Sequence, residues 1–333
     1  MAMLPPDPEY TLRGCDGPIT CLLFFDESAV SDPDSKNCKK SLICGTQPGS
    51  IYVWNLDTRR VQRRIESHKS AVLGLYDLSR SVDSVVECRV LSHGRDGVLY
   101  LWQILNSDWI IIGTFSCCSM NFCRAAVATV SSHFVVAVAT EEQSGIRLIE
   151  IESGEARKTL TPREYNSMPG MCMALTFITK ESGASLKLLA GYEDGRVALW
   201  DCHSATLLSS TVLHPEPVMC LDYSEQLNKG VSGSADDNIH VWTIDKNTEA
   251  ICPVQRLQIT NPGLNCVLFR DDYKFFISGG WDNKIRLFST KNHKALAVLS
   301  YHRDSVQCVA CASDLTLAAG SKDCIISLWN IYK

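Results

Sequence analysis

The chain repeats one pattern seven times: an apolar strand ending in a small residue, a tight turn, and a second strand that closes on a large apolar residue. Examples are VLSHGRDGVLYLW, LLAGYEDGRVALW and FISGGWDNKIRLF. The closing residues are Trp54, Trp102, Ile149 (in a degenerate copy), Trp200, Trp242, Phe288 and Trp329. They are separated by 48, 47, 51, 42, 46 and 41 residues. Such periods are typical of four-stranded propeller blades, so the sequence predicts an all-β, seven-bladed propeller.

The last repeat predicts how the propeller closes. After Trp329 only four residues follow, too few for a turn and a fourth strand. Residues 9–13, EYTLR, have the alternation of a short outer strand. We therefore expect them to complete the last blade, which would remove the exposed sheet edges of an open array. Because the repeats fill the chain, residues 1–333 are expected to form a single domain.

Several repeats carry a recurring set of polar residues, with Asp in the turn six residues before the closing aromatic. Two sets are complete: His68, Ser92, Asp96 and Trp102, and His214, Ser232, Asp236 and Trp242. The last repeat keeps His302, Asp323 and Trp329, with Ala319 in the Ser position. Each set is expected to form a hydrogen-bonded chain inside its blade. Because the sets recur with blade spacing, we interpret them as structural and not as a hydrolase triad.

Composition and motifs argue against several classes of function. Hydrophobic residues make up 45% of the chain and charged residues 21%, and no apolar run reaches the roughly 20 residues of a membrane helix. The start, MAMLPPDPEY, lacks the features of a secretory signal, so a cytoplasmic and nuclear location is expected. The net charge of −5 gives no broad basic surface for nucleic acid. Neither direct nucleic-acid binding nor membrane binding is therefore expected.

No chemical site is expected either. The common nucleophile, metalloprotease and phosphate-binding motifs are absent, so we predict no catalytic, cofactor-binding or metal-binding residues and no cofactor. The 16 cysteines are scattered, many of them on apolar strands, which is typical of buried thiols in a reducing compartment. Cys308 and Cys311 have C-x-x-C spacing, but on a strand they would lie on opposite faces.

A protein-binding surface is expected at the turns next to the structural Asp residues. The candidate partner-binding residues are Arg95, Tyr192, Glu193, Trp281, Tyr301 and Lys322. Trp281 stands out because a large aromatic side chain in an exposed turn can anchor an interface, although packing against the blade is an equal alternative. Two segments, 25–40 and 161–170, have the composition of surface loops, suited either to partner contact or to simple mobility.

The repeats resemble those of WD40 proteins. The stretches LLAGYEDGRVALWD, LHPEPVMCLDY, SGGWDNKIRLF and LAAGSKDCIISLW resemble more closely the guanine nucleotide-binding protein subunit beta-like protein 1 family, which is related to the ASTRA-associated protein 1 of fungi. The resemblance implies a non-catalytic adaptor, a monomeric subunit of a hetero-complex. Its implied partners are the Tel2–Tti co-chaperone complex and the phosphatidylinositol 3-kinase-related kinases, whose maturation and stability support DNA-damage signalling.

The alternative is a generic interaction propeller, such as a ubiquitin-ligase substrate receptor, a chromatin-complex subunit or a G-protein β-like signalling subunit. A ligase receptor usually carries W-D-x-R after a blade, but here the residues at 200–203 are WDCH. A true G-protein β subunit has a long N-terminal helix, whereas eight residues, three of them Pro, precede the first expected strand. Both observations favour the adaptor.

Overall fold

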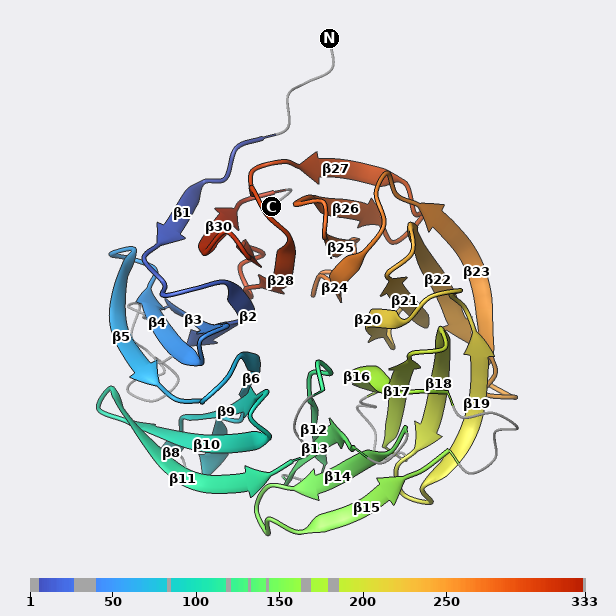
Figure 1. Cartoon of the computed structure of the whole chain (residues 1–333), viewed down its shortest axis with the longest axis horizontal. Coiled ribbons are helices and arrows are strands. Elements are labelled where there is room, and N and C mark those ends of the chain that lie inside the picture. The colour runs from blue at the N-terminus through green and yellow to red at the C-terminus, as the bar shows by residue number, and fades with distance from the viewer. Residues whose placement is uncertain are drawn as a thin grey trace. The chain divides into compact units, whose positions relative to one another are not determined.

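The structure is a computed structural model that describes residues 6–26, 40–82, 85–117, 121–130, 133–141, 144–162, 169–178 and 186–331. These residues form seven four-stranded antiparallel sheets, which are the blades of a β-propeller, and one separate two-stranded ribbon (Figure 1). The predicted all-β, seven-bladed fold is confirmed. No helix in this part of the chain has the length and apolar composition needed to cross a membrane.

One compact unit comprises residues 7–120 and 301–333 and contains three blades. The first blade consists of β2 (Ile19–Asp26), β3 (Lys40–Thr46), β4 (Ser50–Asn55) and β5 (Arg60–Glu66). The second consists of β6 (Val72–Asp77), β9 (Arg89–Gly94), β10 (Val98–Leu105) and β11 (Asp108–Ser116), with the ribbon β7 (Arg80–Val82) and β8 (Val85–Glu87) inserted after β6. The third consists of β28 (Val306–Cys311), β29 (Leu317–Ser321), β30 (Ile325–Trp329) and β1 (Tyr10–Arg13).

The other compact unit comprises residues 121–300 and contains four blades. One blade consists of β12 (Ala126–Val130), β13 (His133–Ala139), β14 (Ile146–Glu150) and β15 (Ala156–Leu160). The next consists of β16 (Cys172–Ile178), β17 (Lys187–Tyr192), β18 (Arg196–Asp201) and β19 (Thr206–Val212). A further blade consists of β20 (Val218–Ser224), β21 (Lys229–Ser234), β22 (Asn238–Ile244) and β23 (Ile251–Gln258). The remaining blade of this unit consists of β24 (Leu264–Phe269), β25 (Phe275–Gly280), β26 (Ile285–Ser289) and β27 (Ala295–Leu299).

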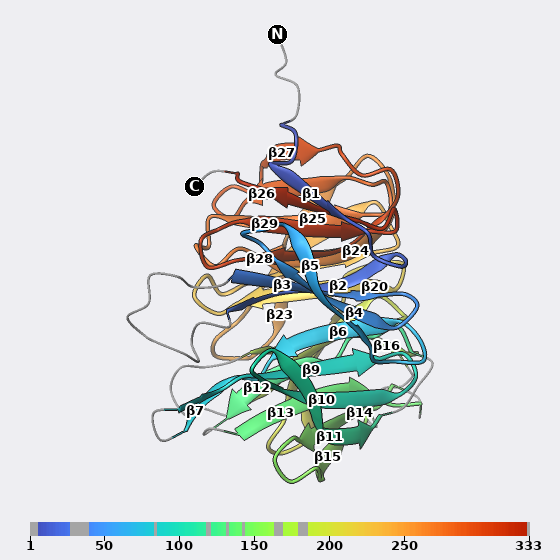
Figure 2. The same ribbon diagram turned by 90° about the vertical axis from the view of Figure 1, so that its left-hand side faces the viewer.

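The N-terminal strand β1 belongs to the blade of the C-terminal strands. It pairs antiparallel with β30, Tyr10 opposite Leu328 and Arg13 opposite Ile325, and its Leu12 side chain is buried. Figures 1 and 2 show β1 beside these strands. The prediction that residues 9–13 supply the missing outer strand is confirmed, with the paired strand beginning at Tyr10. The assignment of the whole chain to one domain stays a prediction.

The closing residues all lie on the third strand of their blades, where they are buried. In six blades the pairing to the outer strand shifts register directly before the closing residue. A β-bulge at that point bends the strand and increases its twist. The sequence repeat therefore marks both a large core side chain and the place where each third strand bends.

The core lies along the middle strands, because both faces of these strands are covered. The second strand β3 is buried at all but its first residue, whereas the outer strand β5 is largely exposed. Burial on both faces explains why the second strands read as continuous apolar runs and not as alternating patterns. The turns that carry the polar sets follow these strands directly.

Candidate functional site

The set at His68 is complete. The His68 Nδ1 atom lies 3.1 Å from Asp96 Oδ1, and its Nε2 atom lies 2.8 Å from Ser92 Oγ. The Trp102 indole N–H donates to the same hydroxyl at 2.9 Å. Burial lowers the pKa of His68 although the Asp96 carboxylate opposes this shift, so the imidazole is neutral at pH 7. The predicted hydrogen-bonded chain is confirmed in this blade.

The set at His214 lacks its last member. His214 lies 3.1 Å from Asp236 and 2.9 Å from Ser232, as predicted. The buried Trp242 Nε1, however, has no hydrogen-bond partner, so its predicted bond to Ser232 is wrong. The residue opposite Trp242 is Gly230, and a Cβ built there would come within 2.2 Å of the indole. The missing side chain lets the ring pack over the glycine instead of turning its N–H toward Ser232.

In the blade formed by β28, β29, β30 and β1, the hydroxyl that contacts the histidine comes from a different strand. His302 Nδ1 lies 3.0 Å from Asp323, and His302 Nε2 lies 2.7 Å from Ser327 Oγ. The Trp329 indole N–H donates to that hydroxyl at 2.8 Å. Ser327 pairs across the sheet with Ala319, the position where the other sets carry Ser. Sequence reasoning missed Ser327, because its pairing with Ala319 is visible only in the folded sheet.

Two other blades use different chemistry at the same positions. In the β24–β27 blade Arg286 donates two hydrogen bonds to the Asp282 carboxylate, at 3.1 and 2.5 Å, and both side chains are largely buried. In the first blade Cys15 and Cys44 take the places of His and Ser, with their Sγ atoms 3.7 Å apart. Burial raises the pKa of the Cys44 thiol well above its ordinary value, which keeps it protonated and unreactive.

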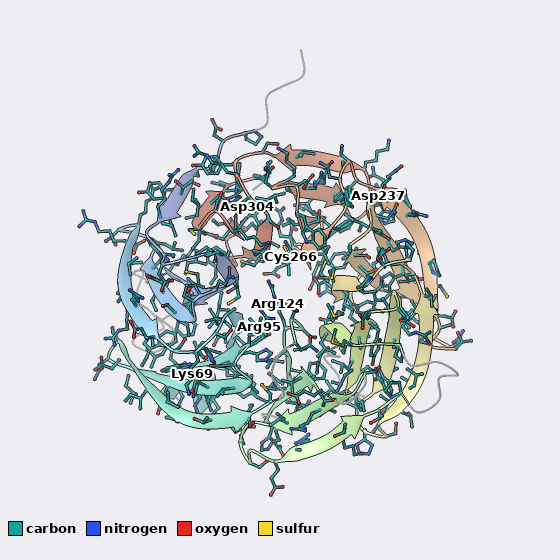
Figure 3. All side chains as sticks on the ribbon, in the orientation of Figure 1. Lys69, Arg95, Arg124, Asp237, Cys266 and Asp304 are labelled. Carbon is teal, nitrogen blue, oxygen red and sulfur yellow. The ribbon has the colours of Figure 1, made fainter. Side chains whose placement is uncertain are left out.

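Four of the predicted partner-binding residues occupy equivalent positions. The backbone N–H groups of Arg95, Glu193, Trp281 and Lys322 each donate to the carbonyl of the residue directly before the innermost strand, at 2.8 to 3.0 Å. Glu193 and Lys322 are exposed, and Arg95 is half-buried. Figure 3 shows Arg95 at the inner side of its blade, with Lys69 farther out. The sequence repeat thus identified a structurally matched set of turn residues.

Trp281 combines packing with exposure. Its indole N–H donates to Asn265 Oδ1 at 2.8 Å, and its ring covers Gly263, where a Cβ would come within 2.1 Å. Gly263 has φ +95, a conformation that favours glycine. Even so, 45% of the Trp281 surface is exposed. The expected packing against the blade is therefore present, and part of the side chain is accessible; the role of Trp281 as an interface anchor stays a prediction.

The two predicted tyrosines differ in exposure, and the assignment of Tyr301 stays a prediction. Tyr192 is completely buried, so its assignment as a partner contact is wrong. It is the last residue of β17, whose side chains are enclosed by the neighbouring strands. Tyr301 is half-buried: its hydroxyl accepts a hydrogen bond from Arg13 at 2.9 Å, and its ring packs edge-on against Trp329. Residues 27–39 and 163–168 of the two predicted loops lie outside the described residues.

Comparison with known proteins decides the family. The chain is 36% identical over 331 residues to the guanine nucleotide-binding protein subunit beta-like protein 1 of Mus musculus, covering 98% of this chain and 97% of the mouse protein. The chain belongs to the guanine nucleotide-binding protein subunit beta-like protein 1 family. The model of the WD domain, G-beta repeat, also matches residues 206–243, 252–289 and 293–330.

The chain also has more distant relatives in fungi. It is 25% identical over 386 residues to the ASTRA-associated protein 1 of Schizosaccharomyces japonicus, with 99% of this chain and 100% of that protein covered. It is 22% identical over 399 residues to the protein of the same name in Schizosaccharomyces pombe, with the same coverage. None of these names is that of an enzyme. The WD repeats make the chain a propeller scaffold of a generally non-catalytic class that acts through protein–protein interaction.

Proposed function

We propose that this protein is a non-catalytic adaptor that supports the co-chaperone-assisted maturation and stability of phosphatidylinositol 3-kinase-related kinases, and hence DNA-damage signalling. The observation that carries the proposal is the full-length similarity to proteins named for association with ASTRA. The proposed partners are the Tel2–Tti co-chaperone complex and the kinases themselves, and the proposed location is the cytoplasm and nucleus.

The contact that we propose for these partners is centred on Trp281. Protein interfaces are enriched in Trp at the positions that contribute most of the binding energy. The hydrogen bond to Asn265 and the packing over Gly263 hold the Trp281 ring in place before binding. A side chain that is already ordered loses little entropy when a partner covers it. These features support Trp281 as an anchor, with Arg95 as a second candidate to be tested separately.

The test is affinity purification of tagged full-length protein from cells, followed by quantitative mass spectrometry of the proteins that co-purify. We expect Tel2–Tti components and large kinases, with recovery reduced at least about tenfold by Trp281→Ala, the effect of losing about 1.4 kcal/mol of binding energy. The matched control is Leu296→Ala, because Leu296 lies on the outer strand of the same blade with 41% of its surface exposed. Thermal melting should show that both variants are folded.

The outcomes separate the function from the surface. Recovery of the same partners with Trp281→Ala and Leu296→Ala would contradict the proposed contact and leave the adaptor function standing. Recovery of a G-protein γ subunit or a cullin adaptor in place of the co-chaperone components would overturn the proposed function.

A further inference from the structure

Three metal-ligating side chains converge in the β20–β23 blade. His214 lies in the connection before β20, Asp236 in the turn between β21 and β22, and His240 on β22. One nitrogen of each imidazole and one carboxylate oxygen lie within 4.8 Å of one another. Two histidines and a carboxylate are a ligand set that proteins use for Zn²⁺, with the fourth position left to water.

His240 distinguishes this blade from the others that carry the His–Asp pair. It pairs across the sheet with Ser232, where the equivalent positions hold Tyr100 in one blade and Ser327 in the other. Its ring meets the His214 ring edge-on, with the centroids 4.3 Å apart. The His240 Nε2 atom is buried and has no hydrogen-bond partner. Buried polar atoms are normally satisfied, so this nitrogen calls for an explanation.

The absent Trp242 bond allows a second tautomer of His214. In the complete set Trp102 donates to Ser92, so the hydroxyl proton of Ser92 is available to the His68 ring. Ser232 receives no proton from Trp242, and its oxygen can instead accept the Nε2–H of His214. Without a metal ion, the Nδ1–H tautomer of His214 donates to the Asp236 carboxylate at 3.1 Å. In the Nε2–H tautomer the Nδ1 lone pair faces that carboxylate, and a metal ion can bind between the two atoms.

We propose that His214, Asp236 and His240 bind a zinc ion. Two ligands at about 2.0–2.1 Å from tetrahedral zinc are separated by about 3.3 Å, close to the observed His214–Asp236 distance. His240 would move toward them by a small rotation of its side chain. Burial and the neighbouring His214 lower the pKa of His240 to about 4, so the imidazole is neutral at pH 7 and able to act as a ligand.

The ionisation of the carboxylate also fits a cation. Burial raises the pKa of Asp236, but hydrogen bonds from His214 and the Asn238 N–H more than offset this, so the net pKa is lowered and the group is charged at pH 7. Arg256 lies opposite His240 in the sheet and opposes the positive charge of an ion, although its position is on the exposed outer strand. A bound ion would tie the connection before β20 to the β21–β22 turn.

A second group within the described residues, His133, Glu150 and Glu152, is a weaker candidate. His133 is exposed, Glu150 is already paired with Arg157, and Glu152 accepts a hydrogen bond from the Phe134 N–H. These partners satisfy both carboxylates without a metal. This group therefore provides a matched control for the site in the β20–β23 blade.

The test is metal binding by the full-length protein after treatment with a chelator. Titration with Zn²⁺ in a calorimeter is expected to show one ion bound per chain. Titration with Co²⁺ is expected to give the visible absorption of nitrogen and oxygen ligands without thiolate charge-transfer bands, which distinguishes this site from the cysteines. His240→Tyr, which copies the residue of the His68 blade, should weaken binding at least 100-fold, whereas His133→Tyr should leave it unchanged.

Three results would overturn the proposal: no ion bound by the wild-type chain, binding unchanged in His240→Tyr, or a Co²⁺ spectrum with thiolate bands. Thermal melting with and without Zn²⁺ adds a second readout. The wild type should melt at a higher temperature when Zn²⁺ is present, because an ion that binds the folded state stabilises it. If His240→Tyr fails to fold, His240→Gln tests the same ligand with a smaller side chain.

Discussion

At the scale of single residues, three blades share a hydroxyl that lies within hydrogen-bond distance of a buried imidazole, and in two of them an indole N–H also donates to it. In two of the three blades this hydroxyl belongs to the second strand, at Ser92 and Ser232. In the last blade it comes from Ser327 on the third strand. Because directly opposed residues of an antiparallel pair lie about 4.5–5.5 Å apart, either strand can deliver the oxygen to the same point.

Replacing Ser327 by Ala is expected to destabilise the protein. It would leave His302 Nε2 and Trp329 Nε1 buried without partners, which costs about 1–3 kcal/mol of unfolding free energy. Urea denaturation measures the change. The control is Ser278→Ala, expected not to destabilise the protein because the buried Ser278 hydroxyl has no hydrogen-bond partner to lose. Adding Ala319→Ser to the Ser327→Ala variant should restore part of the lost stability. Equal effects of Ser327→Ala and Ser278→Ala on stability would refute this account.

The sequence predicted His302, Asp323 and Trp329 because their spacing repeats, but it could not predict Ser327. Which side chains meet across two strands depends on the pairing register, and the register becomes visible only in the folded sheet. Tyr192 shows the same limit. Its position beside the turn suggested exposure, whereas the orientation of its side chain on β17 placed it in the core.

At the scale of elements, the N-terminal strand was predictable because the repeat required a fourth strand in the last blade and residues 9–13 had the right alternation. The ribbon β7–β8 was not predicted, since it is an insertion that the repeat does not require. The β1 strand is only four residues long and forms an edge. Its attachment therefore depends on the backbone ladder with β30 and on Leu12, which is 1% exposed.

Replacing Leu12 by Ala should detach or loosen this strand. Removing a fully buried Leu side chain typically costs about 2–5 kcal/mol. The free energy of unfolding from urea denaturation is the measurement, and protection of the Leu12 and Ile326 amides from hydrogen exchange reports on the β1–β30 ladder. Thr11→Ala is the matched control on the same strand, because Thr11 is only half-buried. A Leu12→Ala protein as stable as Thr11→Ala would show that β1 contributes little to the fold.

At the scale of the whole molecule, buried titratable groups make opposing contributions to stability as the pH changes. Burial lowers the pKa values of His68, His93, His240 and His293, those of His93 and His240 to about 4. Below about pH 6.5 the unfolded chain therefore binds protons that the folded chain does not, and stability is lost as the pH falls. Asp222 opposes this trend, because burial raises its pKa to about 6.

The contribution of Asp222 can be isolated by substitution. Its carboxylate accepts hydrogen bonds from the Phe269 N–H at 2.7 Å and from the Tyr223 N–H at 2.9 Å. Between about pH 4 and 6 the folded state holds a proton on Asp222 that the unfolded state has released, so this group adds stability as the pH falls. Asp222→Asn removes that contribution. It should therefore make the loss of stability on acidification from pH 6 to 4 steeper, by about 1–3 kcal/mol over the interval.

Urea denaturation at several pH values between 4 and 7, with a chelator present to exclude metal binding, measures this slope. Asp245→Asn is the control, because hydrogen bonds from the Thr248 N–H and hydroxyl and from the Asn247 N–H lower the pKa of Asp245. A carboxyl group with a lowered pKa is ionised in both states above about pH 4, so Asp245→Asn should keep the wild-type slope between pH 4 and 6. A slope that is unchanged by Asp222→Asn would mean that Asp222 is already ionised in the folded protein at pH 4, with its two backbone donors outweighing the cost of burial.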